Sequence, residues 1–284
     1  MKNTCFIYFL FSVYLLFSLK AESQFFYKDI ITHQGNLQQY QLQKNNRVQT
    51  IHVTSFENTN NPSEGFYFQQ QFNNSWSQLK TIAGTANSGR NVVINYYNSQ
   101  GLLYRTTDSS NGMYSVYEYL YDSLSRLVQI QNNAMAIGER NKSVEIHNWI
   151  YDAKGTPVKM ERIREKSDTM LILFKQDSVG NIIEEQRFTK GIAGEKTYYY
   201  YDDQKRLTDI VRFSERAGKL IPDFMFDYNE QGQIIQMTTV QPDGRDKITW
   251  TYTYTEPGLK ESETCFLAQK KLAGRMAYQY VFKK

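Results

Sequence analysis

The chain has 284 residues, with 33 lysines and arginines against 29 aspartates and glutamates, and a formal net charge of +4 at pH 7. A charge this close to balance argues against nucleic acid as a partner and against attraction to anionic membranes. The length allows a large hydrophobic core. Aromatic residues are abundant, at 15%, and 22 of them are tyrosines.

The first residues have the order of a secretion signal. Lys2 precedes an apolar run over residues 6–19, and the small residues Ala21 and Ser23 follow it. This run is short for a membrane span, which needs about 20 apolar residues, so an uncleaved anchor is the lesser alternative. We predict a signal peptide at 1–23 and one domain at 24–284. The mature chain would be exported to the periplasm, the outer-membrane surface or the extracellular space, without a membrane span.

Several segments between residues 24 and 140 are irregular or only weakly patterned. Residues 35–40 and 58–64 are polar and read as loops, and 131–139 reads as a longer loop between hairpins. Residues 42–48 and 72–76 look like degenerate copies of the unit described next. Weak end units are expected in a repeat array, because an end unit has only one neighbour.

A unit of about 25 residues then recurs to the end of the chain. It reads aromatic residue, Asp or Asn, two variable residues, Gly or a substitute, and a short apolar strand. The copies start 24 to 30 residues apart, at Tyr97, Tyr121, Tyr151, Gln176, Tyr201, Tyr228 and Tyr254.

Each unit reads as a β-hairpin. Aromatic residues before the turn alternate, as in Tyr117, Tyr119 and Tyr121, which places them on one face of a strand. The acidic residue can cap the turn through its side chain, and the glycine tolerates positive φ. The predicted turn-capping residues are Asp122, Asp152, Asp177, Asp202, Gly101, Gly155, Gly180, Gly232 and Gly258.

Two copies carry a family resemblance. Tyr121-Asp122-x-x-Ser125-Arg126-Leu127 and Tyr201-Asp202-x-x-Lys205-Arg206-Leu207 resemble the YD repeat of RHS-type proteins, in a secreted, Bacteroidota-type setting. The resemblance covers residues 40–284 and implies a repeat fold and secretion. It does not imply a toxin function, because the toxin-enclosing shells of that family are much longer.

The expected fold is therefore all-β. We predict an array of antiparallel β-hairpin repeats that forms a curved or spiralling sheet. The alternative is a β-propeller in which two units make one four-stranded blade. Nine units divide badly into such blades, which favours the sheet.

Catalytic, metal and cofactor sites are not predicted. His33, His52 and His147 are far apart in sequence, and Cys265 reads as a small strand hydrophobe. The turn aspartates could form a metal ladder or paired acids. A structural cap is favoured because Asn98 and Asn229 replace them in two copies, and asparagine cannot act as a general acid or base.

The sequence favours a secreted, non-catalytic repeat protein of the bacterial envelope or surface that binds a glycan or a protein. Tyr96, Tyr198 and Tyr200 fall on the strand face opposite the core aromatics and are candidate contact residues. A purely structural envelope component is one alternative. A carbohydrate-active enzyme with two carboxylates across a groove is another.

Overall fold

The computed structural model describes residues 25–57, 61–165, 167–214, 217–240 and 246–284. The predicted signal peptide lies outside these residues. Where the chain is described, it forms helix α2 (Lys28–Asn45), the short 3-10 helix η1 (Ala268–Lys270) and eighteen strands. The strands are β1 (Val48–Phe56), β2 (Tyr67–Phe72), β3 (Gln78–Thr85), β4 (Gly89–Tyr97), β5 (Leu103–Ser110), β6 (Met113–Tyr121), β7 (Leu127–Ala136), β8 (Ser143–Tyr151), β9 (Pro157–Arg164), β10 (Asp168–Gln176), β11 (Ile182–Thr189), β12 (Ile192–Tyr201), β13 (Leu207–Ser214), β14 (Lys219–Tyr228), β15 (Ile234–Val240), β16 (Lys247–Tyr254), β17 (Lys260–Leu267) and β18 (Lys271–Phe282).

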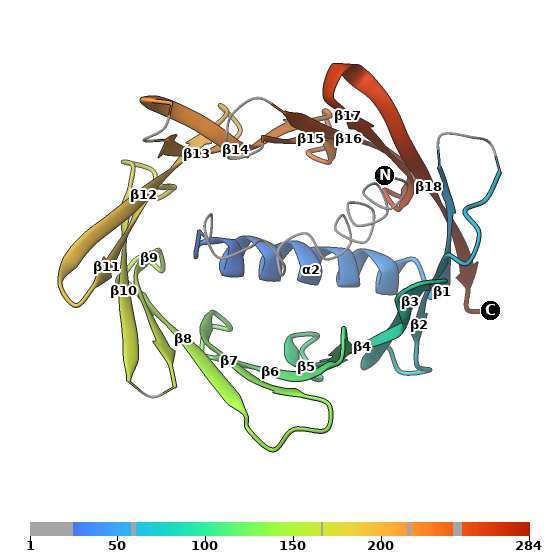
Figure 1. Cartoon of the computed structure of the whole chain (residues 1–284), viewed down its shortest axis with the longest axis horizontal. Coiled ribbons are helices and arrows are strands. Elements are labelled where there is room, and N and C mark those ends of the chain that lie inside the picture. The colour runs from blue at the N-terminus through green and yellow to red at the C-terminus, as the bar shows by residue number, and fades with distance from the viewer. Residues whose placement is uncertain (1–24, 58–60, 166, 215–216, 241–245) are drawn as a thin grey trace.

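The strands close into a single antiparallel barrel (Figure 1). Each strand pairs with its neighbours in sequence, and β1 pairs with both β2 and β18. The closing pair is in register over most of β1, with Ile51 opposite Tyr280 and Val53 opposite Tyr278. Closure leaves no sheet edge with unpaired backbone groups.

The predicted curved or spiralling sheet is therefore wrong, and so is the alternative of a β-propeller. The hairpins follow one another as expected, but the twist and tilt of successive strands bring the last strand back to the first. Pairing β1 with β18 satisfies two rows of backbone groups that an open array would expose. That gain favours the closed form.

Helix α2 lies inside the barrel (Figure 1). An eighteen-stranded barrel has a lumen too wide for wall side chains alone to fill, and an α-helix with its side chains is about 10–12 Å across. The prediction that residues 35–40 are irregular is wrong, because they lie within this helix. The prediction of a degenerate repeat unit over 42–48 is also wrong, because the helix ends at Asn45 and β1 begins at Val48. No helix in the described ranges is long and apolar enough to cross a membrane.

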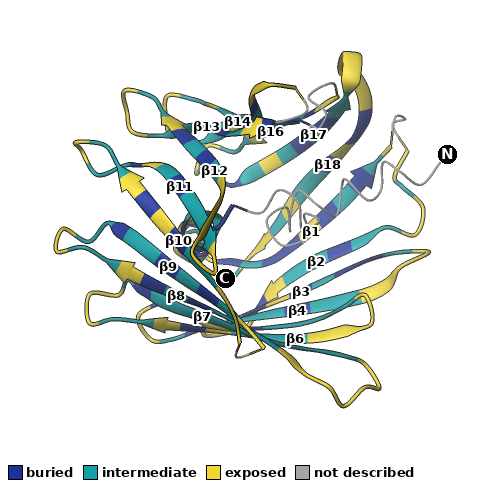
Figure 2. Ribbon diagram, turned by 60° about the vertical axis from the view of Figure 1, so that its left-hand side comes forward, coloured by how far each residue is buried: buried dark blue, intermediate teal, exposed yellow. Residues whose placement is uncertain are grey.

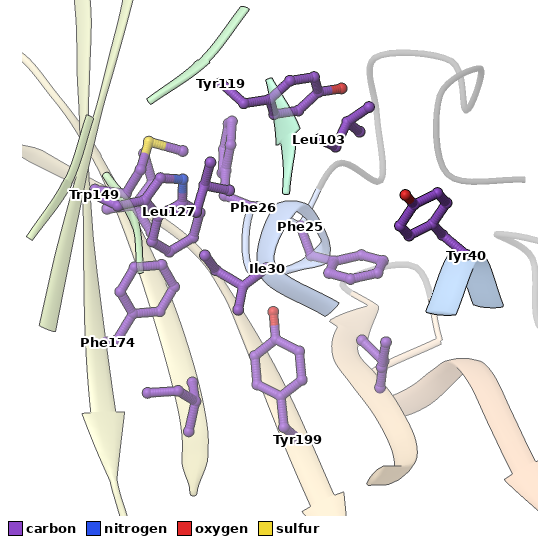
Figure 3. Close-up of a cluster of buried hydrophobic side chains, with 14 of the residues drawn as sticks. Phe25, Phe26, Ile30, Tyr40, Leu103, Tyr119, Leu127, Trp149, Phe174 and Tyr199 are labelled. Atoms are coloured by element: carbon purple, nitrogen blue, oxygen red, sulfur yellow. The ribbon is translucent and has the colours of Figure 1, made fainter. Parts of the chain in front are cut away.

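The luminal side chains form two clusters. In the larger one, Phe25, Phe26 and Ile30 from the helix segment pack against wall residues such as Trp149 and Tyr199 (Figure 3). The second cluster lies around Ile51 of β1, Trp250 of β16 and Met276 of β18. Burial alternates along the strands and the hairpin tips are exposed (Figure 2).

The alternating aromatics before the turns of different units divide between these clusters. Tyr119, Tyr201 and Phe226 belong to the first, whereas Tyr252 packs in the second. The alternation therefore points aromatic side chains inward, toward two packing centres.

The segment predicted as a loop at 131–139 is mostly strand. Strand β7 continues to Ala136, which pairs with Met113 of β6. Asn132 and Asn133 are unfavourable in strands by propensity. Pairing on both sides with β6 and β8 overrides that local preference.

Candidate functional site

The predicted turn aspartates lie at successive turns along one end of the barrel. Each accepts two backbone hydrogen bonds through Oδ1, from the N–H groups two and four residues further on; for Asp122 both are 2.9 Å. The same pair of bonds recurs at Asp152, Asp177 and Asp202. The N–H of Arg126 and its side chain lower the pKa of Asp122. The structure does not bring these carboxylates together at one centre.

The glycines of the same turns have left-handed backbone geometry. Gly180 has φ of 91°, and Ser125 and Lys205 adopt φ of 61° and 62° where glycine is replaced. The other predicted glycines, Gly101, Gly155, Gly232 and Gly258, also have positive φ.

The repeat tyrosine has a role that the aromatic pattern did not reveal. Its hydroxyl donates to a backbone carbonyl just after the turn of the preceding unit, as from Tyr151 to Leu127 O at 2.6 Å. The same bond joins Tyr121 to Leu103, Tyr201 to Ile182, Tyr228 to Leu207, Tyr254 to Ile234 and Tyr280 to Lys260. The sequence signal for this hydrogen bond was that the first residue of the repeat unit is usually tyrosine and not phenylalanine.

We expect Asp202→Asn to leave the melting temperature nearly unchanged, because the amide oxygen can still accept the N–H groups of Gln204 and Arg206. Asp202→Ala should lower it measurably more, because both acceptors are lost. Thermal melts of the two variants check this. Equal losses in both would show that the charge of Asp202, and not its accepting oxygen, matters.

A shallow groove lies on the outer face of β4, β5 and β6. Inside the barrel, Tyr97 stacks on Tyr40 of the helix with ring centroids 3.7 Å apart. Its neighbour Tyr96 therefore points outward. The groove has a volume of about 370 Å³ and is lined by Val92, Ile94, Tyr96, Tyr104, Arg105, Thr107, Ser109 and Tyr114.

Three tyrosines dominate this groove. The rings of Tyr96 and Tyr104 are 6.3 Å apart and tilted by 52°. Tyr104 and Tyr114 are 45% and 40% exposed. A register shift opposite Tyr96 and Tyr97 leaves Tyr104 as an extra residue, so that Tyr96 pairs with Arg105. The sequence analysis considered only aromatics before the turns, so it named Tyr96 and not Tyr104, which follows a turn.

The two other predicted surface tyrosines lie elsewhere. Tyr198 and Tyr200 are on the outer face of β12, opposite Val211 and Asp209, and Tyr200 is 48% exposed. They do not line the groove.

Inside the barrel, Glu185 of β11 binds the start of the helix segment. Its carboxylate accepts the N–H of Phe26 at 2.9 and 3.0 Å, the N–H of Tyr27 at 2.9 Å and the hydroxyl of Tyr199 at 2.8 Å. Glu185 is 1% exposed. Burial raises its pKa, and the hydrogen bonds from Tyr27 and Phe26 act against that rise.

A second carboxylate contact joins the helix to β8. His147 Nδ1 lies 2.5 Å from Asp29 Oδ2, and Nε2 lies 2.9 Å from Glu145 Oε1. Arg162 Nη2 donates to Glu145 Oε2 at 3.1 Å. Burial lowers the pKa of His147, but the charges and hydrogen bonds of Asp29 and Glu145 outweigh it and raise the pKa to about 9.

The charge on His147 removes it as a base or metal ligand. Both ring nitrogens of the imidazolium donate to carboxylates, so neither has a free lone pair. Burial would raise the pKa of Glu145, but hydrogen bonds from His147 and Arg162 lower it to about 2. Within the described residues no group of three or more His, Cys, Asp or Glu side chains could hold a metal ion. This network therefore holds the helix in place.

The remaining candidates are dispersed. His52 is exposed on the outer face of β1, and Cys265 is buried on β17 opposite Trp250. His33 is buried on α2, against the ring of Tyr119 at 5.6 Å. His33 and His147 line the same luminal cavity, which their sequence positions did not suggest.

No protein-family model and no curated protein matches the chain. Among solved structures, it is similar to the crystal structure of TcdB2-TccC3 at 14% identity and a TM-score of 0.35, over 73% of this chain but only 12% of that one. It is also similar to a porin-like protein from Bacteroides uniformis at 11% identity and a TM-score of 0.38, over 82% of this chain and 98% of that one. Both TM-scores are below 0.5, so we infer nothing about function from them.

Proposed function

We propose that the protein is a secreted, non-catalytic β-barrel of the bacterial envelope or surface that binds a glycan in the outer groove on β4–β6. The observation that carries the proposal is the gathering of Tyr96, Tyr104 and Tyr114 in one hollow of an otherwise mixed surface. The resemblance to YD repeats supports export and stays a prediction.

The groove suits the two-sided chemistry of a sugar. Tyrosine rings offer flat apolar faces to the C–H side of a sugar ring, and their hydroxyls can hydrogen-bond. Thr107, Ser109 and Arg105 add further hydrogen-bonding groups beside them. The volume of about 370 Å³ falls within the roughly 300–1,000 Å³ of small-ligand sites.

Binding without catalysis is the better-supported form of this proposal. A glycosidase needs two carboxyl groups about 5 to 9.5 Å apart across the scissile bond. The described residues that line the groove include no Asp or Glu. The luminal acids Asp29 and Glu145 are paired with His147 and Arg162.

The strands are rigid supports for such a site. Each groove residue belongs to β4, β5 or β6, or to the bulge between β4 and β5, and these strands are paired on both sides. A fixed aromatic surface loses little conformational entropy on binding. A purely structural envelope protein would have no need for this cluster.

The test is a glycan-array screen of the mature protein, followed by titration of any hit. Tyr104→Ala is expected to weaken binding about tenfold or more, because ring stacking and buried area are lost. Tyr200→Ala is the matched control, since Tyr200 is equally exposed on β12, and it should bind normally. Failure to retain any glycan, or equal binding by Tyr104→Ala, would contradict the proposal.

A further inference from the structure

A second cavity lies inside the barrel, on the luminal face of β5–β8, and shares only β5 and β6 with the outer groove. It lies between helix α2 and strands β5–β8, is partly open, and has a volume of about 170 Å³. The helix contributes Lys28, Asp29, Thr32, His33 and Asn36. The sheet separates this cavity from the outer groove, so the two sites are independent.

Three buried polar atoms that belong to residues lining this cavity have no hydrogen-bond partner among the described residues: Thr32 Oγ1, His33 Nδ1 and Asn132 Oδ1. Buried polar groups in folded proteins are normally paired. Three such atoms around one cavity indicate that it accommodates a hydrogen-bonding molecule.

The role of His33 follows from its neighbour. Tyr121 donates its hydroxyl hydrogen to Leu103 O at 2.5 Å, so the same hydroxyl oxygen accepts the N–H of His33 Nε2 at 3.0 Å. Burial lowers the pKa of His33 to about 4, which keeps the ring neutral near pH 7. His33 Nδ1 is then a hydrogen-bond acceptor, as is Asn132 Oδ1.

The charged groups around the cavity already have partners. Asp29 and Glu145 are paired with His147, which is itself positively charged. Lys28 stands beside Asp29, which adds a positive charge close to a negative one. A ligand is therefore not required to supply charge, but it must donate hydrogen bonds.

The other wall of the cavity is less polar. Leu103, Ile130, Tyr117 and Tyr119 face the helix residues across it. A cavity with one acceptor on each wall, His33 Nδ1 on the helix and Asn132 Oδ1 on β7, beside aromatic and aliphatic surface fits a ring that carries several hydroxyl groups. Its volume is below the range of drug-sized sites, which limits the ligand to a single small ring.

We infer that the luminal cavity binds a small neutral polyhydroxylated molecule of the size of one monosaccharide. Its hydroxyl groups donate to His33 Nδ1 and Asn132 Oδ1 and exchange a hydrogen bond with Thr32 Oγ1. Its apolar face packs against Tyr117 and Ile130, because Tyr119 is buried and its ring already stacks on His33. Asn36 is exposed and lines the cavity, so the ligand enters beside it.

The experiment titrates glucose, N-acetylglucosamine and myo-inositol separately into the mature protein, with binding followed by calorimetry and saturation-transfer NMR. At least one is expected to bind saturably. Thr32→Val keeps the side-chain shape and removes one hydroxyl, and should weaken that binding about tenfold. Thr107→Val makes the same change in the outer groove and should leave it unchanged.

A second variant guards against an effect on folding. Asn132→Leu replaces an unpaired acceptor with an apolar side chain of similar size, so it should bind weakly while its melting temperature stays equal or rises. The inference is overturned if none of the three compounds binds saturably. It is also overturned if Thr32→Val and Asn132→Leu bind like the wild type, or if Thr107→Val is the variant that loses binding.

Discussion

Replacing Glu185 with alanine is expected to release the start of the helix segment from the barrel wall and to lower the free energy of unfolding by roughly 3–5 kcal/mol. The reason is the number of donors left behind. The N–H groups of Phe26 and Tyr27 and the hydroxyl of Tyr199 all donate to this one buried carboxylate. Each unpaired buried group costs about 1–3 kcal/mol.

Urea unfolding and amide hydrogen exchange over residues 26–44 measure the two effects. The matched control is Glu184→Ala, the next residue along β11, which faces outward and pairs with Lys175 and Lys196. The partners of Glu184 are lysines whose side chains are 65% and 35% exposed, so water can solvate them in the variant and the control should lose far less stability than Glu185→Ala.

Glu185→Gln refines the test. The amide keeps one accepting oxygen but turns its NH₂ group toward donors. We therefore expect the free energy of unfolding of Glu185→Gln to lie between those of the wild type and Glu185→Ala. Equal stability and equal exchange in Glu185→Ala and Glu184→Ala would show that helix α2 is held by packing alone.

The local structure was largely readable from the sequence, whereas closure of the sheet was not. The turn motif and the alternation of Tyr117, Tyr119 and Tyr121 predict hairpins with inward aromatics, and both features are local. Closure depends on the number of strands and on the tilt accumulated over all of them. A period-two pattern is the same in an open sheet and a closed one.

The helix was missed because it lacks the usual signal. A surface helix shows one apolar stripe, but α2 is surrounded by the barrel wall. Its buried residues are mixed in character: Ile30, His33, Tyr40 and Gln43. The wall offers both apolar rings and carboxylates, so polar helix residues find partners inside.

The luminal contacts were unreadable for a related reason. Asp29 and His147 are 118 residues apart and meet only because the helix lies inside the closed barrel. One local hint was present. Glu145 and His147 are two residues apart on one strand and therefore share the luminal face.

The stability of the protein is expected to fall by about 3 kcal/mol as the pH rises from about 6.5 to about 9, because of His147. The unfolded chain loses this proton near pH 6.5, whereas the folded protein keeps it until about pH 9, since Asp29 and Glu145 outweigh the effect of burial. Below pH 6.5 His147 is protonated in both the folded and the unfolded state. The contacts of His147 with Asp29 and Glu145 then contribute fully to stability.

His33 gives the opposite dependence on the acid side. Burial lowers its pKa to about 4, so the unfolded state takes up a proton first and stability falls as the pH drops from 6.5 toward 4. Glu145 adds to this loss below about pH 4.5, because its folded pKa is about 2. Stability therefore falls above pH 6.5 because of His147 and below pH 6.5 because of His33 and Glu145, so its maximum is expected near pH 6.5.

Chemical unfolding at a series of pH values isolates the alkaline limb when three proteins are compared. His147→Gln keeps hydrogen-bonding capacity but cannot titrate, so its stability should no longer fall between pH 6.5 and 9, although its stability at pH 6.5 will be lower than that of the wild type. His52→Gln changes an exposed histidine on the outer face of β1 and should keep the full alkaline slope. If the slope persists in His147→Gln, another group carries it, and the contact between Asp29 and His147 does not hold the helix through charge.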